Sequence, residues 1–418
     1  MTAIRYLCLG LPLLAVLAAA RWDRDRNARA AALLSFVAAA VGVAVLHELA
    51  RSTGWYTFAP VHGAYRELPV DLWIGWAALW GPLPVLLRRV LPLPVALGLL
   101  GWLDAVTMPA LAPLLRLGPD WLAGEAVGLL GVALPAQLLG RWSARRRHLR
   151  ARVLLQTGLF GVLLLWFLPT VTFTLTDGSW ARLGDLTVSG ALLLAQLALL
   201  PAVPALAAVR EFAVRGGGTP YPWDPPRRLV TTGPYAFLAN PMQTGAVALL
   251  LLTALVTGSL PLVGCAALAV AFGVAVAGPH EAYDLESRYG ARWRDHRLRV
   301  RPWWPRWRPY LPGEPAVLWL DDGCGPCSGL RRFLDRRGPV NLVIVPAARY
   351  PYGVLWRAGY AGGDGHAERG VAAVARALEH LHFGWAWLGW LLRLPGVTWL
   401  AQVVTDAMIA PPHPARPG

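Results

Sequence analysis

The chain of 418 residues contains no lysine, and all 39 of its basic side chains are arginine. Charged residues of either sign are scarce: they make up 15% of the chain, whereas soluble proteins carry about 25%. Hydrophobic residues make up 56%, and several apolar runs reach the roughly 20 residues that a helix needs to cross a bilayer. The scarcity of charge excludes an ordinary soluble protein. It predicts a polytopic α-helical membrane protein, with the lipid bilayer as its surroundings.

The net charge of the chain is +15, because acidic residues are rarer still than basic ones. In a soluble protein such a charge would favour nucleic acid as a partner. Here the arginines lie in short loops beside the apolar runs, which is the usual pattern of membrane proteins. We therefore expect no nucleic-acid partner.

Nine apolar runs are predicted to span the membrane. They cover residues 3–20, 29–50, 70–88, 92–115, 121–140, 152–172, 186–209, 241–257 and 261–278. Arginine alternates along the loops between them: residues 21–29 hold four and residues 141–152 hold six, whereas residues 173–185 hold few. Because cytoplasmic loops carry the excess of arginine, we expect the N-terminus outside and the C-terminal part in the cytoplasm of a bacterial plasma membrane.

Residues 213–245 form a polar segment, rich in glycine and proline, between two of these runs. Paired prolines such as Pro225-Pro226 exclude a helix there, and non-helical backbone at membrane depth must line a cavity. A helix is predicted to restart at Asn240-Pro241, since proline is tolerated in a first helical turn. The free N–H groups of such a helix start suit an anionic carboxylate.

Two blocks of residues flank the last predicted hairpin. The first block contains Gly233, Pro234, Tyr235, Pro241, Met242 and Gly245, and the second contains Glu281, Leu285, Tyr289 and Gly290. Over about residues 210–306 the chain resembles the membrane methyltransferases of the isoprenylcysteine carboxyl methyltransferase and phospholipid methyltransferase type. It departs from that pattern at Ala239-Asn240, where the family has Arg-His, at Gln243, where it has Tyr, and at Ala282, where it usually has Glu.

The resemblance implies an enzyme that takes a methyl group from S-adenosyl-L-methionine. The acceptor would be lipophilic: a prenylated, isoprenoid or lipid molecule. The residues implied in donor binding are Gly233, Tyr235, Asn240, Pro241, Gly245, His280 and Glu281. An alternative is that the prolines and glycines only form a re-entrant connector and that Glu281 is an ordinary interfacial acid.

The composition changes after Pro309. An apolar run at 315–320 is compatible with a buried strand, a helical pattern follows, and residues 340–345 predict a second strand. Between the first strand and the helix lies Cys324-Gly325-Pro326-Cys327. A strand, a Cys-x-x-Cys sequence, a helix and a strand in this order are typical of a thioredoxin-like α/β domain.

Together with Asp321, the two cysteines make the opening of this domain resemble the DCC family of thiol-disulfide oxidoreductases, over about residues 316–408. The resemblance implies that Asp321, Cys324 and Cys327 form a catalytic site with an unknown thiol or disulfide partner. We expect Cys324 at the helix start to be the nucleophile, with the lower pKa and the greater exposure, and Cys327 to resolve the mixed disulfide. A zinc site is the alternative, but it needs four ligands. We expect no metal.

Two further features lie outside these sites. Residues 384–396 are apolar but too short to span, which predicts a core or interfacial helix. Residues 1–209 resemble no family, and ionisable side chains inside their predicted spans are functional candidates by default. The strongest is Asp104, followed by Glu125 and the pair His47-Glu48.

The sequence thus predicts three parts. They are a membrane part of about seven spans at 1–209, a methyltransferase-like membrane part at 210–310, and a thioredoxin-like cytosolic domain at 314–418. The favoured function is methyl transfer to a lipophilic acceptor, fused to thiol-disulfide exchange. Two alternatives remain open: a thiol-disulfide oxidoreductase whose methyltransferase-like part is only an anchor, and a transporter or lipid-binding scaffold.

Overall fold

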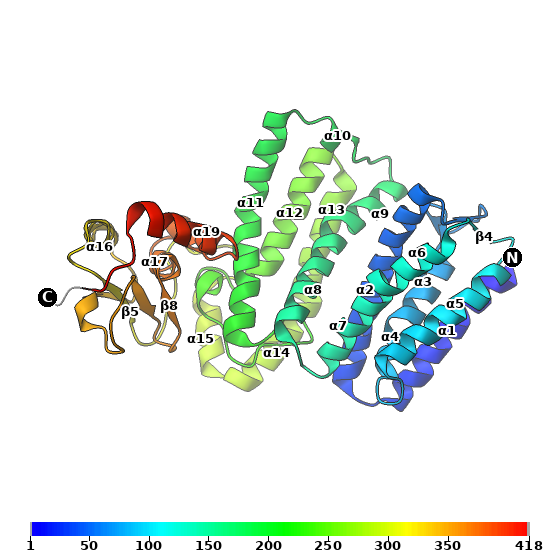
Figure 1. Cartoon of the computed structure of the whole chain (residues 1–418), viewed down its shortest axis with the longest axis horizontal. Helices are drawn as coiled ribbons and strands as arrows, with labels where there is room; N and C mark the ends of the chain where they lie inside the picture. Colours follow the sequence, from blue (N-terminus) through cyan, green and yellow to red (C-terminus); the bar gives the residue numbers. More distant parts are fainter. Residues whose placement is uncertain (1, 416–418) are drawn as a thin grey trace. The chain divides into compact units, whose positions relative to one another are not determined.

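A computed structural model describes residues 2–415, apart from the side chain of His280. Its contacts divide the chain into two compact units (Figure 1). The first unit comprises residues 1–184, 219–225 and 254–262, and the second comprises 185–218, 226–253 and 263–418. The predicted boundary at residue 209 does not coincide with this division, because the long helix before it belongs with the segment that follows.

The first unit is a bundle of helices with two small antiparallel sheets. Its helices are α1 (Thr2–Trp22), α2 (Arg26–Thr53), α3 (Val70–Trp80), α4 (Pro82–Leu86), α5 (Leu93–Ala110), α6 (Trp121–Gly128), α7 (Leu134–Ala144), α8 (Leu149–Val162), α9 (Leu168–Leu175) and α10 (Ala181–Gly184). The π-helical turns Leu129–Ala133 and Leu163–Phe167 join α6 to α7 and α8 to α9. The strands pair as β1 (Tyr56–Phe58) with β4 (Leu115–Leu117) and β2 (Ala64–Tyr65) with β3 (Leu68–Pro69).

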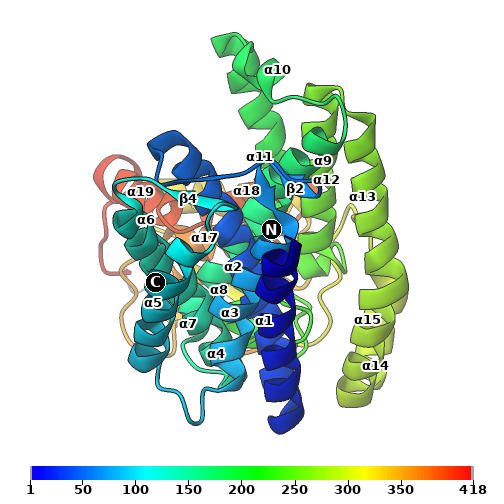
Figure 2. The ribbon, with the colours of Figure 1, turned by 90° about the vertical axis from the view of Figure 1, so that its right-hand side faces the viewer.

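Helix α2 lies at the centre of this bundle, with α3, α4 and α7 packed against it (Figure 2). Small residues allow the close approach: a Cβ on Gly81 would lie 2.5 Å from the carbonyl oxygen of Ser35. The Ser35 hydroxyl donates to the carbonyl oxygen of Ala136 at 2.8 Å, which satisfies a buried polar group. Asp25 caps the start of α2, and Gly54 ends it in a left-handed conformation.

The second unit joins membrane helices to a four-stranded sheet. Its helices are α11 (Val188–Glu211), extended by the π-helical turn Phe212–Gly216, the 3-10 turn η4 (Gly233–Ala236), most of α12 (Pro241–Thr257) and of α13 (Leu260–Phe272), the π-helical turn Gly273–Ala277, α14 (Gly278–Tyr289), α15 (Ala291–Arg299), α16 (Gly325–Arg337), α17 (Val371–Leu378), α18 (Phe383–Leu392) and α19 (Val397–Val404). The strands are β5 (Ala316–Leu320), β6 (Leu342–Pro346), β7 (Gly359–Ala361) and β8 (Ala367–Arg369).

The strand order of this sheet is β6-β5-β7-β8. β5 and β6 run parallel and are connected through α16, and β7 is antiparallel to both of its neighbours. α16 packs against β5, and α17 packs against β7 and β8. The core of this region contains the fully buried Leu318, Leu334 and Ala373. The two predicted strands and the helix between them are thus present.

Seven helices are long and apolar enough to cross a membrane in the described part of the chain. Two of the nine predicted spans coincide with shorter apolar helices, at 70–86 and 241–257. The class of a polytopic helical membrane protein is confirmed, while the count of nine stays a prediction. The predicted core helix is α18, whose Trp390 is completely buried.

Candidate functional site

The turn η4 and the segment after α15, which are about 65 residues apart in sequence, lie side by side. Three backbone hydrogen bonds join residues 236–239 to residues 301–310. The buried ring of His296 adds a contact of 2.9 Å between its Nε2 and the carbonyl oxygen of Tyr235. The first block of the resemblance is therefore joined to the segment that follows the second block.

Gly233 opens η4 in a left-handed conformation, with φ at +61°. A Cβ at this position would lie 3.2 Å from two side-chain carbons of Glu211 on α11. Glycine is needed here both for the backbone angle and for the space beside the Glu211 carboxylate.

Tyr235 is buried, and its hydroxyl has no hydrogen-bond partner among the described residues. Burial raises the pKa of Tyr235 well above its ordinary value, and the nearby charges of Glu281 and Glu211 raise it further. Burial also raises the pKa of Glu281, which the charge of Arg297 partly opposes. Glu281 is thus close enough to Tyr235, and Arg297 close enough to Glu281, for each charge to influence the pKa of its neighbour.

The start of α12 carries the next candidates. Pro241 is its first residue, and the carbonyl oxygen of Asn240 accepts hydrogen bonds from both the backbone and the hydroxyl of Thr244. The Asn240 side chain is half-buried. Gln243, where the family has Tyr, has a buried Oε1 without a partner in the described part of the chain.

Gly245 has a packing role. A Cβ there would lie 2.6 Å from the Cβ of Ala205 and 2.8 Å from the carbonyl oxygen of Pro201, both on α11. The glycine therefore allows α11 and α12 to approach closely. Its role in donor binding stays a prediction, as does that of His280, whose side chain lies outside the described part of the structure.

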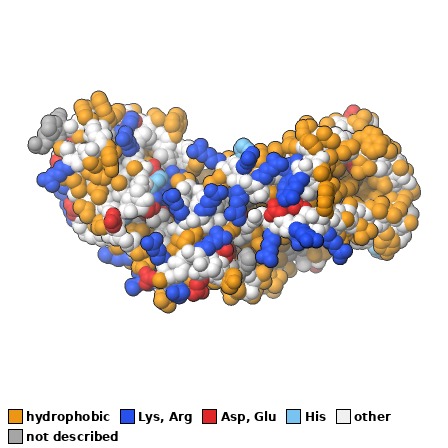
Figure 3. Space-filling view, turned by 90° about the horizontal axis from the view of Figure 1, so that it is seen from below, with side chains coloured by type: hydrophobic (Ala, Val, Ile, Leu, Met, Phe, Trp, Pro, Cys, Tyr) orange, Lys and Arg blue, Asp and Glu red, His pale blue; other side chains and the backbone are white. Residues whose placement is uncertain are grey.

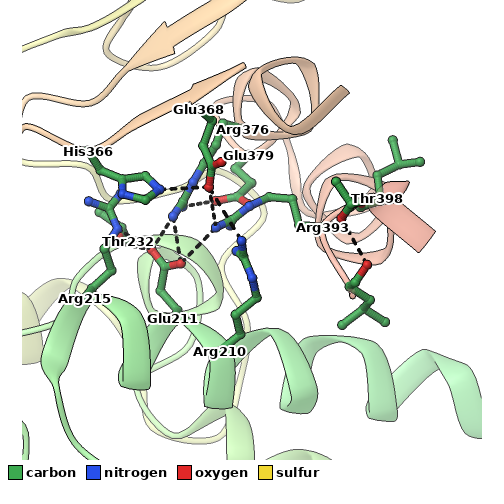
Figure 4. A network of polar contacts seen from close by, with 12 residues as sticks. Arg210, Glu211, Arg215, Thr232, His366, Glu368, Arg376, Glu379, Arg393 and Thr398 are labelled. Atoms are coloured by element: carbon green, nitrogen blue, oxygen red, sulfur yellow. Dashed lines mark hydrogen bonds and ion pairs between the residues drawn. The ribbon is translucent and has the colours of Figure 1, made fainter. Parts of the chain in front are cut away.

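The sequence analysis missed a buried network of charges around Glu211 (Figure 4). Glu211 accepts two hydrogen bonds of 2.8 Å from Arg376 on α17, and Arg393 beyond α18 lies 3.3 Å away. Both arginines also contact Glu379, at 2.9 and 2.6 Å. The pair Arg210-Glu211 at the end of an apolar run was the available signal, but its partners are more than 160 residues away.

A third carboxylate, Glu368, belongs to the same network. It lies 2.8 Å from Nε2 of His366 and within 4 Å of Arg210 and Arg393. Burial alone would raise the pKa of Glu368, but the hydrogen bond with His366 and the charge of Arg393 lower it to about 2. Because buried charges are tolerated only when paired, these contacts hold the sheet region against α11.

The cysteine pair lies where β5 leads into α16. Cys324 is the residue before the helix, and no side chain caps the free N–H groups there. Both thiols are free, and Cys324 is the more buried, at 8% exposed. The expectation that Cys324 is more exposed is therefore wrong, because its position between strand and helix covers it. Burial and the neighbouring Cys324 raise the pKa of Cys327 to about 12.

Asp321 shapes the turn before the cysteines. One carboxylate oxygen accepts from the backbone N–H of Gly323 at 2.9 Å, and the other lies 2.8 Å from Nε2 of His413. Its carbonyl oxygen accepts from the N–H of Cys324 at 3.4 Å. Among the described residues, no three His, Cys, Asp or Glu side chains cluster as metal ligands would.

In the first unit, the structure brings Asp104 and Glu125 together. Asp104 is 2% exposed, accepts from the indole N–H of Trp80 at 3.0 Å, and shares a hydrogen bond with Glu125. Two carboxyl groups can share a hydrogen bond only if one carries a proton. The pair His47-Glu48 lies elsewhere, on an open cavity of about 420 Å³.

Residues 191–292 match the family model for phospholipid methyltransferases. The matched range contains both blocks of the resemblance and also Glu211, and it covers about a quarter of the chain. The chain matches no curated protein and no solved structure. The chain is thus a polytopic membrane protein in which residues 191–292 are similar to phospholipid methyltransferases.

Proposed function

We propose that the chain is an integral membrane methyltransferase that takes its methyl group from S-adenosyl-L-methionine. The observation that carries the proposal is that the buried Tyr235 and the half-buried Glu281, from the two halves of the matched range, lie close enough for the charge of Glu281 to raise the pKa of Tyr235. The acceptor would be lipophilic, as for enzymes of the isoprenylcysteine carboxyl methyltransferase type.

The polar groups fit such a donor. The Tyr235 hydroxyl and the Gln243 Oε1 are buried atoms that lack partners among the described residues, and unpaired buried polar atoms are costly unless a ligand satisfies them. Glu281 would hold the ammonium or ribose hydroxyls of the donor. The start of α12 and Arg297 would hold its carboxylate.

When bound, the donor supplies a methyl group on a positively charged sulfur. Transfer to an anionic nucleophile of the acceptor, such as a carboxylate, breaks the bond between sulfur and methyl, leaves a neutral thioether and cancels both charges. Surroundings that exclude water favour a step in which charge disappears, and the apolar packing around Tyr235 supplies them. The residues of the chain then bind and orient the reacting groups, and no covalent intermediate with the protein is needed.

Donor binding to the full chain in detergent tests this proposal. Glu281→Gln should weaken binding by about tenfold or more, the effect of removing one charge-assisted contact. Glu286→Gln is the matched control, because Glu286 lies on the same helix but is exposed. If the folded protein binds no donor, or if both variants bind equally, the transferase proposal fails and the anchor alternative replaces it.

A second activity is favoured by the cysteine pair. We infer that residues 314–418 form a thioredoxin-like domain of DCC type that exchanges disulfides. The β5-α16-β6 unit with Cys-x-x-Cys at the helix start supports this, as does the high pKa of Cys327. The Cys324 thiolate would attack the disulfide of a partner and release one partner thiol. Cys327 would then attack Cys324, leaving the partner reduced and the pair oxidised.

Trapping distinguishes these roles. Cys327→Ser should retain a mixed disulfide between Cys324 and the partner, because the resolving thiol is lost. Cys324→Ser should retain none. If both variants trap partners equally, or if the wild-type pair cannot be oxidised to a disulfide, the assignment is wrong.

A further inference from the structure

An arginine-lined cavity of about 410 Å³ lies in the first unit, between the end of α4, the start of α5 and the end of α7. Four arginines line it, together with the apolar side chains of Leu93 and Leu138. None of its residues falls within 191–292, so the cavity is separate from the transferase segment.

Arg141 is the central group of this cavity. It is 8% exposed, and one of its nitrogens donates to the carbonyl oxygens of Pro84 and Leu91, at 3.1 and 2.8 Å. Its Nε has no partner, and no carboxylate among the described residues pairs with it. A buried cation without an anion is costly, so Arg141 fixes a positive charge where a ligand can neutralise it.

The other cations add to this charge in different ways. Arg88 is already neutralised by Asp23 and Asp25, and therefore contributes shape more than charge. Arg145 and Arg147 are exposed, and neither forms an ion pair within residues 2–415. The cavity therefore carries an excess of positive charge.

The start of α8 adds to the positive electrostatic potential of the cavity. His148, the residue before α8, lines the cavity, and no side chain caps the N–H groups of the first turn of α8. An uncapped helix start of this kind favours anions. Figure 1 draws this end of the helices at its lower edge, and Figure 3, seen from below, shows that arginines are frequent on that face.

We propose that this cavity binds the phosphate of an anionic lipid headgroup. Arginine forks match phosphate oxygens in geometry and charge. The cavity lies at the start of α5 and the end of α7, two candidate membrane-spanning segments, and therefore at the expected level of the lipid headgroups. Basic pockets between membrane helices are typical binding sites for such headgroups. Leu93 and Leu138 suit the upper acyl chains, and the indole of Trp142 suits the interface.

The test uses the full chain, delipidated in detergent, with dioctanoyl phosphatidic acid as the probe. One saturable site is expected. Arg145→Gln/Arg147→Gln should weaken binding by about tenfold, since two charge-assisted contacts are lost from exposed positions that do not affect folding. Arg24→Gln/Arg26→Gln, which removes two exposed charges outside the cavity, should leave binding unchanged.

Two further probes identify the source of the phosphate. Dioctanoylglycerol, which lacks the phosphate, should not bind, and inorganic phosphate should compete only weakly because it makes no acyl contacts. Inorganic phosphate binding as tightly as the lipid would overturn the lipid assignment. The absence of saturable binding, or an equal loss in both double variants, would overturn the site itself.

Discussion

At the scale of single residues, the choice of amino acid is most restricted at Gly233, which lies close to the side chain of Glu211. The glycine combines a positive φ with a close approach to a buried charge, so both its backbone and its missing side chain matter. This residue was expected to contact the donor, and the structure gives it a second role in holding η4 against α11.

Gly233→Ala should therefore destabilise the protein by about 1–3 kcal/mol, because the new methyl group is strained by its backbone angle and meets Glu211. The loss of stability is measured by thermal unfolding in detergent, with tryptophan fluorescence as the signal. Gly329→Ala on α16 is the control: apart from its chain neighbours and the backbone of its own helix, nothing lies within 4 Å of where a Cβ would be, and alanine there should be neutral or stabilising. An equal response of the two variants would contradict the steric argument.

The cysteines allow a second test at this scale. In a Cys8→Ala/Cys265→Ala background near pH 7, iodoacetamide should modify Cys324 well before Cys327, because the pKa of about 12 keeps Cys327 protonated. Mass spectrometry of the peptides follows both rates. In Cys324→Ser, Cys327 should react faster than in the parent protein, since the neighbouring sulfur that raises its pKa is gone. Similar rates in the parent protein would be incompatible with the pKa difference.

At the scale of elements, apolar runs predicted the helices well because burial in lipid requires no partner from elsewhere in the chain. All nine runs coincide with helices, and the short helix α18 was predicted as a core element. The small strands β1 and β4 were missed, because three residues carry too little periodicity to recognise. The predicted run 92–115 was too long, since α5 ends at Ala110 and β4 follows.

The pair Asp104-Glu125 joins α5 to α6 and gives the prediction for this scale. Asp104→Asn should be tolerated, because an amide oxygen still accepts from Trp80 and the amide N–H₂ donates to Glu125. Asp104→Leu should cost about 1–3 kcal/mol, because it leaves two buried polar groups unpaired. The free energies of unfolding of both variants, measured in detergent, test this prediction. Equal stability of Asn and Leu at this position would show that the hydrogen bonds contribute nothing.

At the scale of the whole molecule, the sequence could not predict how the sheet region meets the membrane helices. Trp390 on α18 packs edge-on against Phe237 at 5.4 Å, and both lie in a core with Val203 of α11. These residues are up to 187 positions apart in the sequence. A local pattern of hydrophobic residues cannot predict contacts between residues so far apart. The predicted domain from 314 onward stays a prediction, and the contacts place the sheet region in one compact unit with α11.

The network around Glu368 makes the stability of this unit depend on pH. The carboxylate has a pKa of about 2 in the folded protein and an ordinary value of 4.5 in the unfolded chain. Its contribution is complete above pH 4.5 and is lost as the pH falls toward 2. Unfolding of Glu368→Gln should depend less on pH within this window, whereas the exposed Glu314→Gln should follow the parent protein. An unchanged pH dependence in Glu368→Gln would contradict the shift.

The Glu211 network also has a consequence for biogenesis. Glu211 leaves the ribosome 165 residues before Arg376 and 182 before Arg393. At synthesis rates of about 5–20 residues per second this interval is roughly ten to thirty seconds, during which the carboxylate at the end of α11 lacks these two arginines. The matched methyltransferase-like segment is therefore finished only when the last quarter of the chain has been made. A ribosome that stops early releases a protein whose membrane helices are complete but whose Glu211 has only the nearby Arg215 and Thr232 as partners, without Arg376 and Arg393. This difference offers quality-control proteases a means to distinguish it from the full-length chain.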